Sequence, residues 1–138
     1  MRSALALAAI VVVVASCSPT DAAPRSREEV VGALESAGLR VCTTDDAPSG
    51  IDGVVDAREL AVAVGSCDSG ATGRVVVATL QDEDDRDRII AALLAVHRPR
   101  FADGVWTMGT TTVAISGVPD DEVVERVGRA MDALGANG

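Results

Sequence analysis

The chain has 138 residues, a length that allows one domain and little more. Its charged residues are 12 Arg, no Lys and 21 acids, which gives a formal net charge of −9 at pH 7. A surface of this sign repels nucleic-acid phosphates and anionic lipid headgroups, so nucleic acid is not an expected partner and attachment to a membrane requires a covalent or inserted anchor. With one Phe, one Trp and no Tyr, the chain also has few platforms on which sugars or bases stack.

The first 16 residues have the pattern of an export signal. Arg2 supplies a positive start, residues 4–15 form an unbroken apolar run, and small and polar residues follow. A helix of this run would be about 18 Å long, well short of the ~30 Å hydrocarbon core of a bilayer. We therefore expect residues 1–16 to be a signal peptide, with a permanent transmembrane span as the alternative.

Val14-Ala15-Ser16-Cys17 resembles the lipobox of bacterial lipoproteins, in which an aliphatic residue and two small residues precede a cysteine. The resemblance implies that Cys17 is acylated, becomes the first residue of the mature chain and holds the protein on the extracytoplasmic face of the cell membrane. Two or more acyl chains anchor firmly, at ~0.8 kcal/mol per buried CH₂. Ordinary secretion with cleavage near Ala22 or Ala23 is the alternative.

The chain has three cysteines, which leaves one over in an exported protein. If Cys17 carries lipid, Cys42 and Cys67 remain as a pair, and outside the cytoplasm a disulfide between them is the expected state. Closing this loop would stabilise the fold by roughly 3 kcal/mol. A redox pair or a metal site is disfavoured, because a CxxC spacing is absent and the chain has a single His.

The mature chain divides into a tether and one domain. Residues 17–26 contain two prolines and mostly polar residues, and we interpret them as the lipidated cysteine and its tether. The single domain is expected over 27–135, and residues 136–138 form a C-terminal tail. We find no internal repeat.

The first half of the domain is expected to form a helix and three strands. Ser26 and Glu29 have the spacing of a capping box, apolar residues then recur at helical spacing, and Gly38 suits the helix end. Strands are expected over 39–43, 60–64 and 74–80, the last two as a hairpin. The Asp-, Pro- and Gly-rich stretch 44–53 is expected to be a loop.

The second half is expected to form two helices around a hairpin. A helix opens within 81–87, where acids suit its N-terminus, and His97 and nearby Arg residues suit its C-terminus. Strands over 105–108 and 111–116 turn near Gly109. A third helix begins at Pro119-Asp120 and ends at Gly135.

The resulting order is αβββαββα. Strands joined by short turns pair antiparallel, so we expect a two-layer α+β domain with a largely antiparallel sheet and the helices packed on one face. Ala37-Gly38, Cys42, Cys67 and Asp103-Gly104-Val105-Trp106 are similar to features of small secreted actinobacterial lipoproteins. This looser resemblance implies a location and a fold more than an activity.

No catalytic residue, metal or cofactor is predicted. His97, the only histidine, lies among Arg residues before Pro99, where a capping or solvent-exposed role is expected. The acidic run 82–87 lacks the spacing of a calcium-binding EF-hand and fits a solvated helix start. The acids of the 45–56 segment are the better metal candidates, because loop carbonyls can add ligands, and whether they bind a metal stays open.

Trp106 is the residue most able to mark a binding surface. It is expected in the core, but if exposed it would be the natural anchor for a partner. We expect a non-enzymatic domain that binds or senses an unidentified ligand, either a protein or a small molecule, in the cell envelope.

Two alternatives remain. One is a small envelope hydrolase that uses paired carboxylates, which a cleft with two acids of raised pKa would favour. The other is an accessory subunit that docks onto a larger envelope complex, which an exposed apolar patch of several hundred Å² would favour.

Overall fold

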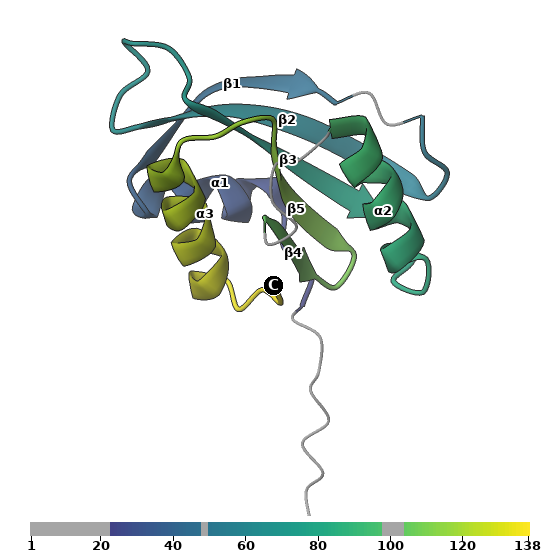
Figure 1. Cartoon of the computed structure of the whole chain (residues 1–138). Coiled ribbons are helices and arrows are strands. Elements are labelled where there is room, and N and C mark those ends of the chain that lie inside the picture. The colour runs from purple at the N-terminus through teal and green to yellow at the C-terminus, as the bar shows by residue number, and fades with distance from the viewer. Residues whose placement is uncertain (1–22, 48–49, 98–103) are drawn as a thin grey trace, which may run out of the picture.

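A computed structural model describes residues 23–47, 50–97 and 104–138. The predicted signal peptide and Cys17 lie outside the described residues. The elements follow the predicted order αβββαββα (Figure 1): α1 (Arg27–Ser36), β1 (Leu39–Asp46), β2 (Val54–Val64), β3 (Gly73–Leu80), α2 (Arg86–His97), β4 (Val105–Met108), β5 (Thr111–Ser116) and α3 (Asp121–Ala133). None of the helices in the described part of the chain has the length and apolar character needed to cross a membrane.

The five strands form one antiparallel sheet in the order β1-β2-β3-β5-β4. The β4–β5 hairpin places β5 against β3, which leaves β4 at one edge. There Thr107 and Asn137 exchange two backbone hydrogen bonds of 2.8 and 3.0 Å, so the C-terminal residues cover part of this edge. Pairing of this kind shields an edge strand from other chains.

The two faces of the sheet carry separate hydrophobic cores. Val75 and Val77 of β3 belong to the larger core, together with the buried sides of α1 and α3. Val76 and Ala78 belong to the smaller core, together with Ile89 of α2. Successive residues of a strand point to opposite faces, so α1 and α3 cover one face and α2 covers the other.

The α+β class, the antiparallel sheet and the element order are thus as predicted, and α2 departs from the expectation that all helices share one face. Figure 1 shows α1 and α3 close together and α2 apart from them. The reason lies in β3 and β5, where residues 75–78 and 111–116 are buried without interruption, so that both faces of these strands need a cover.

The β1–β2 hairpin is longer than predicted. The loop expected over 44–53 is shorter, because β1 continues to Asp46 and β2 begins at Val54. Asp46 forms an ion pair with Arg58 across this hairpin, and Asp56 pairs with the same Arg58 along β2. The Ala47 N–H donates to the carbonyl of residue 57 at 3.0 Å. Cross-strand pairing thus accommodates acids that are typical of loops.

The helix ends follow local chemistry. The predicted capping box is confirmed, since Glu29 N–H donates to Ser26 Oγ at 3.2 Å and Ser26 N–H donates to the Glu29 carboxylate at 2.8 Å. Helix α2 begins at Arg86, near the end of the predicted 81–87 start, because the acids before it form turns. In one of these turns the Asp84 N–H donates to Asp82 Oδ1 at 2.9 Å.

Candidate functional site

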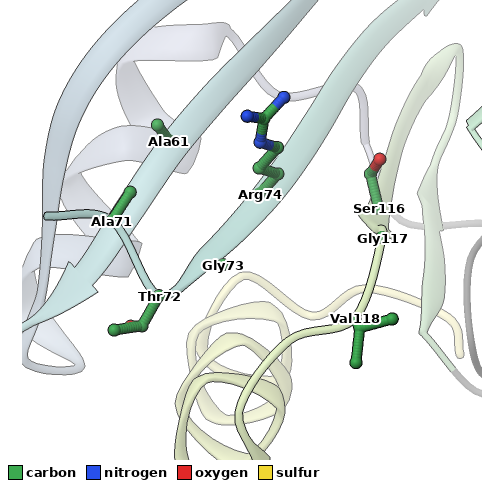
Figure 2. A pocket seen from close by; sticks show the side chains of 8 residues that line it. All are labelled: Ala61, Ala71, Thr72, Gly73, Arg74, Ser116, Gly117 and Val118. Atoms are coloured by element: carbon green, nitrogen blue, oxygen red, sulfur yellow. The ribbon is translucent and has the colours of Figure 1, made fainter.

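The sheet has a hollow on the α2 face, at the end remote from the β4–β5 turn. Its centre is a row of three residues in register, because Ala61 of β2 pairs with Arg74 of β3 and Arg74 pairs with Ser116 of β5. The three side chains point to the same side of the sheet (Figure 2). Helix α2 packs farther along the same face, against Val76 and Ala78. It therefore leaves the row of Ala61, Arg74 and Ser116 open to the hollow.

The hollow has a volume of about 240 Å³ and a mixed lining. Its lining residues come from β2, from the β2–β3 connection, from β3, and from β5 and the loop that follows: Ala61, Ala71, Thr72, Gly73, Arg74, Ser116, Gly117 and Val118. The lining combines small apolar groups, two hydroxyls and a single charge, the guanidinium of Arg74. Val118 is 77% exposed and forms an apolar rim.

Arg74 is held by one ion pair and stays accessible. Its Nη1 donates to Oε1 of Glu59 at 2.9 Å, and its side chain is 65% exposed while that of Glu59 is 21% exposed. A guanidinium has five N–H donors, so one bond to Glu59 leaves most of its hydrogen-bonding capacity for a ligand. An ion pair of this exposure contributes little to stability, which allows it to rearrange.

Backbone hydrogen bonds fix the walls of the hollow. The Thr72 N–H donates to the Val62 carbonyl at 2.8 Å, which holds the β2–β3 connection against β2. The Thr72 carbonyl accepts from the Asp120 N–H at 3.4 Å, which links the same connection to the start of α3. The β2–β3 connection is therefore tied both to β2 and to the start of α3.

The predicted disulfide supports one of these walls. Cys42 and Cys67 are bonded, with their Cα atoms 5.7 Å apart. The bond joins β1 to the β2–β3 connection, which also carries Ala71 and Thr72. It therefore constrains the segment that forms one side of the hollow.

Trp106 does not mark a binding surface, because it lies in the core. It is 8% exposed and packs in the larger core with residues of α3. The C-terminal Gly138 covers the indole, since an added Cβ there would lie 3.5 Å from Nε1. The question of whether Trp106 is core or exposed is thus answered in favour of the core.

The acidic segments form no metal centre in the described part of the chain, where groups of three or more His, Cys, Asp or Glu suited to an ion are absent. In the 45–56 segment, Asp46 and Asp56 flank Arg58 instead. His97 is the last residue of α2, and its side chain lies outside the described residues.

A second hollow of about 310 Å³ lies between α1 and α3. It is lined mainly by small side chains, and the guanidinium of Arg129 at its rim pairs with Glu125 at 2.6 Å. This groove has the form left when two helices meet through alanines. Its described lining has no pair of neighbouring polar residues comparable to Arg74 and Ser116 in the first hollow.

The N-terminal segment joins the domain at the other end of β5. The Arg25 N–H and carbonyl both bond to the Thr111 hydroxyl, and Arg25 Nη2 donates to the Leu134 carbonyl at 3.3 Å. Pro24 packs over Gly109 in the β4–β5 turn, where an added Cβ would lie 2.7 Å from Pro24 Cγ. Hydrogen bonds from Ser26 and Arg25 also hold the pKa of Glu29 below its ordinary value.

The residues of the first hollow were not singled out in the sequence. Arg74 is the first residue of a predicted apolar strand and Gly117-Val118 precedes a helix, and neither context is distinctive. Only the strand register brings Arg74 next to Ala61 and Ser116.

Comparison of the chain with protein-family models, curated proteins and solved structures found no match. The protein itself is an α+β domain with an antiparallel sheet and a hollow at the end of that sheet.

Proposed function

We propose that the protein is a lipid-anchored lipoprotein of the bacterial cell envelope whose domain binds a ligand in the Arg74 hollow and performs no catalysis. The observation that carries this proposal is the separation between the hollow and the N-terminal attachment. Arg25 is fastened to Thr111 at one end of β5, and Ser116 lines the hollow at the other end. Five residue steps of extended strand separate these ends by about 17 Å.

This separation fits an anchored binding domain. A lipid on Cys17 would attach at the Thr111 end, so the hollow would open away from the bilayer. The eight residue steps from Cys17 to Arg25 can reach at most about 28 Å, which keeps the domain near the membrane surface. The net charge of −9 disfavours direct adsorption to anionic headgroups, so the lipid would carry the attachment.

The two alternative functions gain less support. Hydrolysis by paired carboxylates requires two acids across one cleft, and the described lining of the hollow contains no Asp or Glu. Docking onto a larger complex calls for a contiguous apolar patch. The large apolar side chains that are exposed in the described part of the chain lie on separate elements, namely Val55 on β2, Val96 on α2 and Val118 after β5.

A fragment titration tests the binding role. The mature chain, with Cys17→Ser so that it stays soluble, is ¹⁵N-labelled and titrated with propionate, propionamide and propylammonium, which share one carbon skeleton but differ in charge. The proposal predicts that at least one fragment shifts the amide resonances of Arg74, Ser116 and Gly117 in a saturable way. The amides of Ala33 and Ala133, in the groove between α1 and α3, should stay unchanged.

The contrary result is equally definite. If none of the three fragments shifts the amides that line the hollow, even at tens of millimolar, the hollow is a surface irregularity and the binding role is abandoned.

A further inference from the structure

We infer that the ligand of the Arg74 hollow is the carboxylate-bearing terminal residue of a peptide with a small side chain. The inference rests on the proposed binding function and specifies its ligand. Three features of the hollow carry it: its size, the charge of its lining and the shape of its walls.

The size indicates the end of a chain rather than a whole ligand. At ~30 Å³ per water molecule, a volume of about 240 Å³ holds roughly eight waters, which is enough for one amino-acid residue but not for a longer segment. Pockets that enclose a complete drug-sized ligand measure ~300–1,000 Å³. A longer molecule would therefore place one residue in the hollow and leave the rest outside, along the open rim at Val118.

The charge indicates a carboxylate. Arg74 is the only charged residue among the described residues of the lining. Its planar guanidinium presents parallel N–H donors that match the two oxygens of a carboxylate. Because Arg74 bonds to Glu59 through Nη1, the remaining N–H groups of this exposed side chain can receive the ligand.

The walls indicate a small side chain. Ala61 and Ala71 contribute methyl groups on one side, and Gly117, beside which an added Cβ would meet open space, lies on the other. Ser116 adds a hydroxyl group on the same side as Arg74, whereas the side chain of Thr72, which also lines the hollow, points away from Arg74 (Figure 2). The walls therefore offer apolar contacts of methyl size, which the side chain of a small residue such as alanine matches.

The test compares two peptides that differ only at the terminus. N-acetyl-Ala-Ala with a free carboxylate and the same peptide with a terminal carboxamide are titrated into the ¹⁵N-labelled mature chain carrying Cys17→Ser. We expect the carboxylate form to bind about tenfold more tightly, because a charge-assisted hydrogen bond is lost in the amide. Resonances of Arg74 and Ser116 should report both titrations.

Two matched variants assign the effect to Arg74. Arg74→Gln keeps a polar side chain without the charge, and it should weaken the carboxylate peptide about tenfold while leaving the amide peptide unchanged. Arg40→Gln removes an exposed Arg on β1 of the same sheet, outside the lining, and should change neither affinity. Unchanged amide spectra away from the substituted residue show that both variants fold.

The outcomes separate this inference from the proposed function. If the amide peptide binds as tightly as the carboxylate peptide, or if Arg74→Gln has no effect, the carboxylate assignment is overturned and the binding role stands. If propionate binds as tightly as the peptide, the ligand is a free acid and the peptide assignment is overturned. If none of the three fragments shifts the amides that line the hollow, the proposed binding function falls, and this inference, which rests on it, falls with it.

Discussion

Arg25 and Thr111 lie 86 residues apart in the sequence and share two hydrogen bonds: the Arg25 N–H donates to Thr111 Oγ1 at 3.1 Å, and the Thr111 hydroxyl donates to the Arg25 carbonyl at 2.8 Å. Thr111 is only 2% exposed, so both bonds are shielded from water on one side. They fasten the residues before α1 to the start of β5 and determine where a tether would leave the domain.

Removing this hydroxyl should destabilise the domain. Thr111→Val preserves the shape of the side chain but leaves the Arg25 N–H without its partner, so we expect a loss of about 1–3 kcal/mol in the free energy of unfolding. Urea denaturation followed by tryptophan fluorescence measures the loss. Thr79→Val, at the exposed position that pairs with Thr111 on β3, is the matched control and should stay within about 0.5 kcal/mol of the parent. Equal effects of the two substitutions would contradict the role of the hydroxyl.

The disulfide should contribute substantially to stability. Replacing Cys42 and Cys67 together by Ser opens a loop with a sequence separation of 25 residues. We expect the free energy of unfolding to fall by roughly 3 kcal/mol, chiefly because the unfolded chain gains conformational freedom. Chemical denaturation of the parent and the double variant gives the difference, and a free energy that stays the same would show that the bond does not stabilise the domain.

The stability of the domain should depend on pH through Glu29, at the start of α1. The pKa of Glu29 is lowered in the folded state by the hydrogen bonds from Ser26 and Arg25, so its ionised form favours folding. This contribution is present above about pH 4.3, the ordinary pKa of a glutamate, and is lost as the pH falls through the lower folded value. Glu29→Gln retains the capping pattern but does not titrate. The difference in unfolding free energy between parent and variant should therefore shrink below about pH 4.3, and parallel pH profiles would refute the assignment.

Trp106 should report the integrity of the larger core. Because it is the only Trp and is 8% exposed, its fluorescence should be blue-shifted in the folded protein and move to the red on unfolding. Trp106→Ala should cost about 3–5 kcal/mol, and Trp106→Phe less, because a ring still fills the space under Gly138. An emission maximum typical of solvent-exposed Trp in the native state would place this residue outside the core.

The parts of the fold set by local chemistry were predictable. The capping box of Ser26 and Glu29 and the hairpin around Gly109 depend on residues close together in the chain, and both are present. The position of α2 depends instead on long-range packing, because this helix covers the face of the sheet opposite to α1 and α3. The unbroken apolar run of residues 75–78 is a signal of a strand buried on both faces, and it indicates why helices lie on both sides.

The candidate site was not predictable from one sequence. Arg74, Ala61 and Ser116 meet because three strands align in a particular register, and that register is set by long-range packing. The acids of the 45–56 segment were the better candidates for metal ligands in the sequence. In the structure, Asp46 and Asp56 form ion pairs with Arg58. Charge pairing across a hairpin and ligand clusters use the same residue types, and only their spatial arrangement distinguishes them.

The proposed orientation of the hollow depends on the lipid anchor at Cys17. Intact-mass spectrometry of the protein extracted from membranes by detergent tests it most directly. We expect a chain that begins at Cys17, carries the mass of acyl groups, and gains two hydrogens on reduction of the bond between Cys42 and Cys67. A soluble product that begins beyond Cys17 without added mass would contradict it.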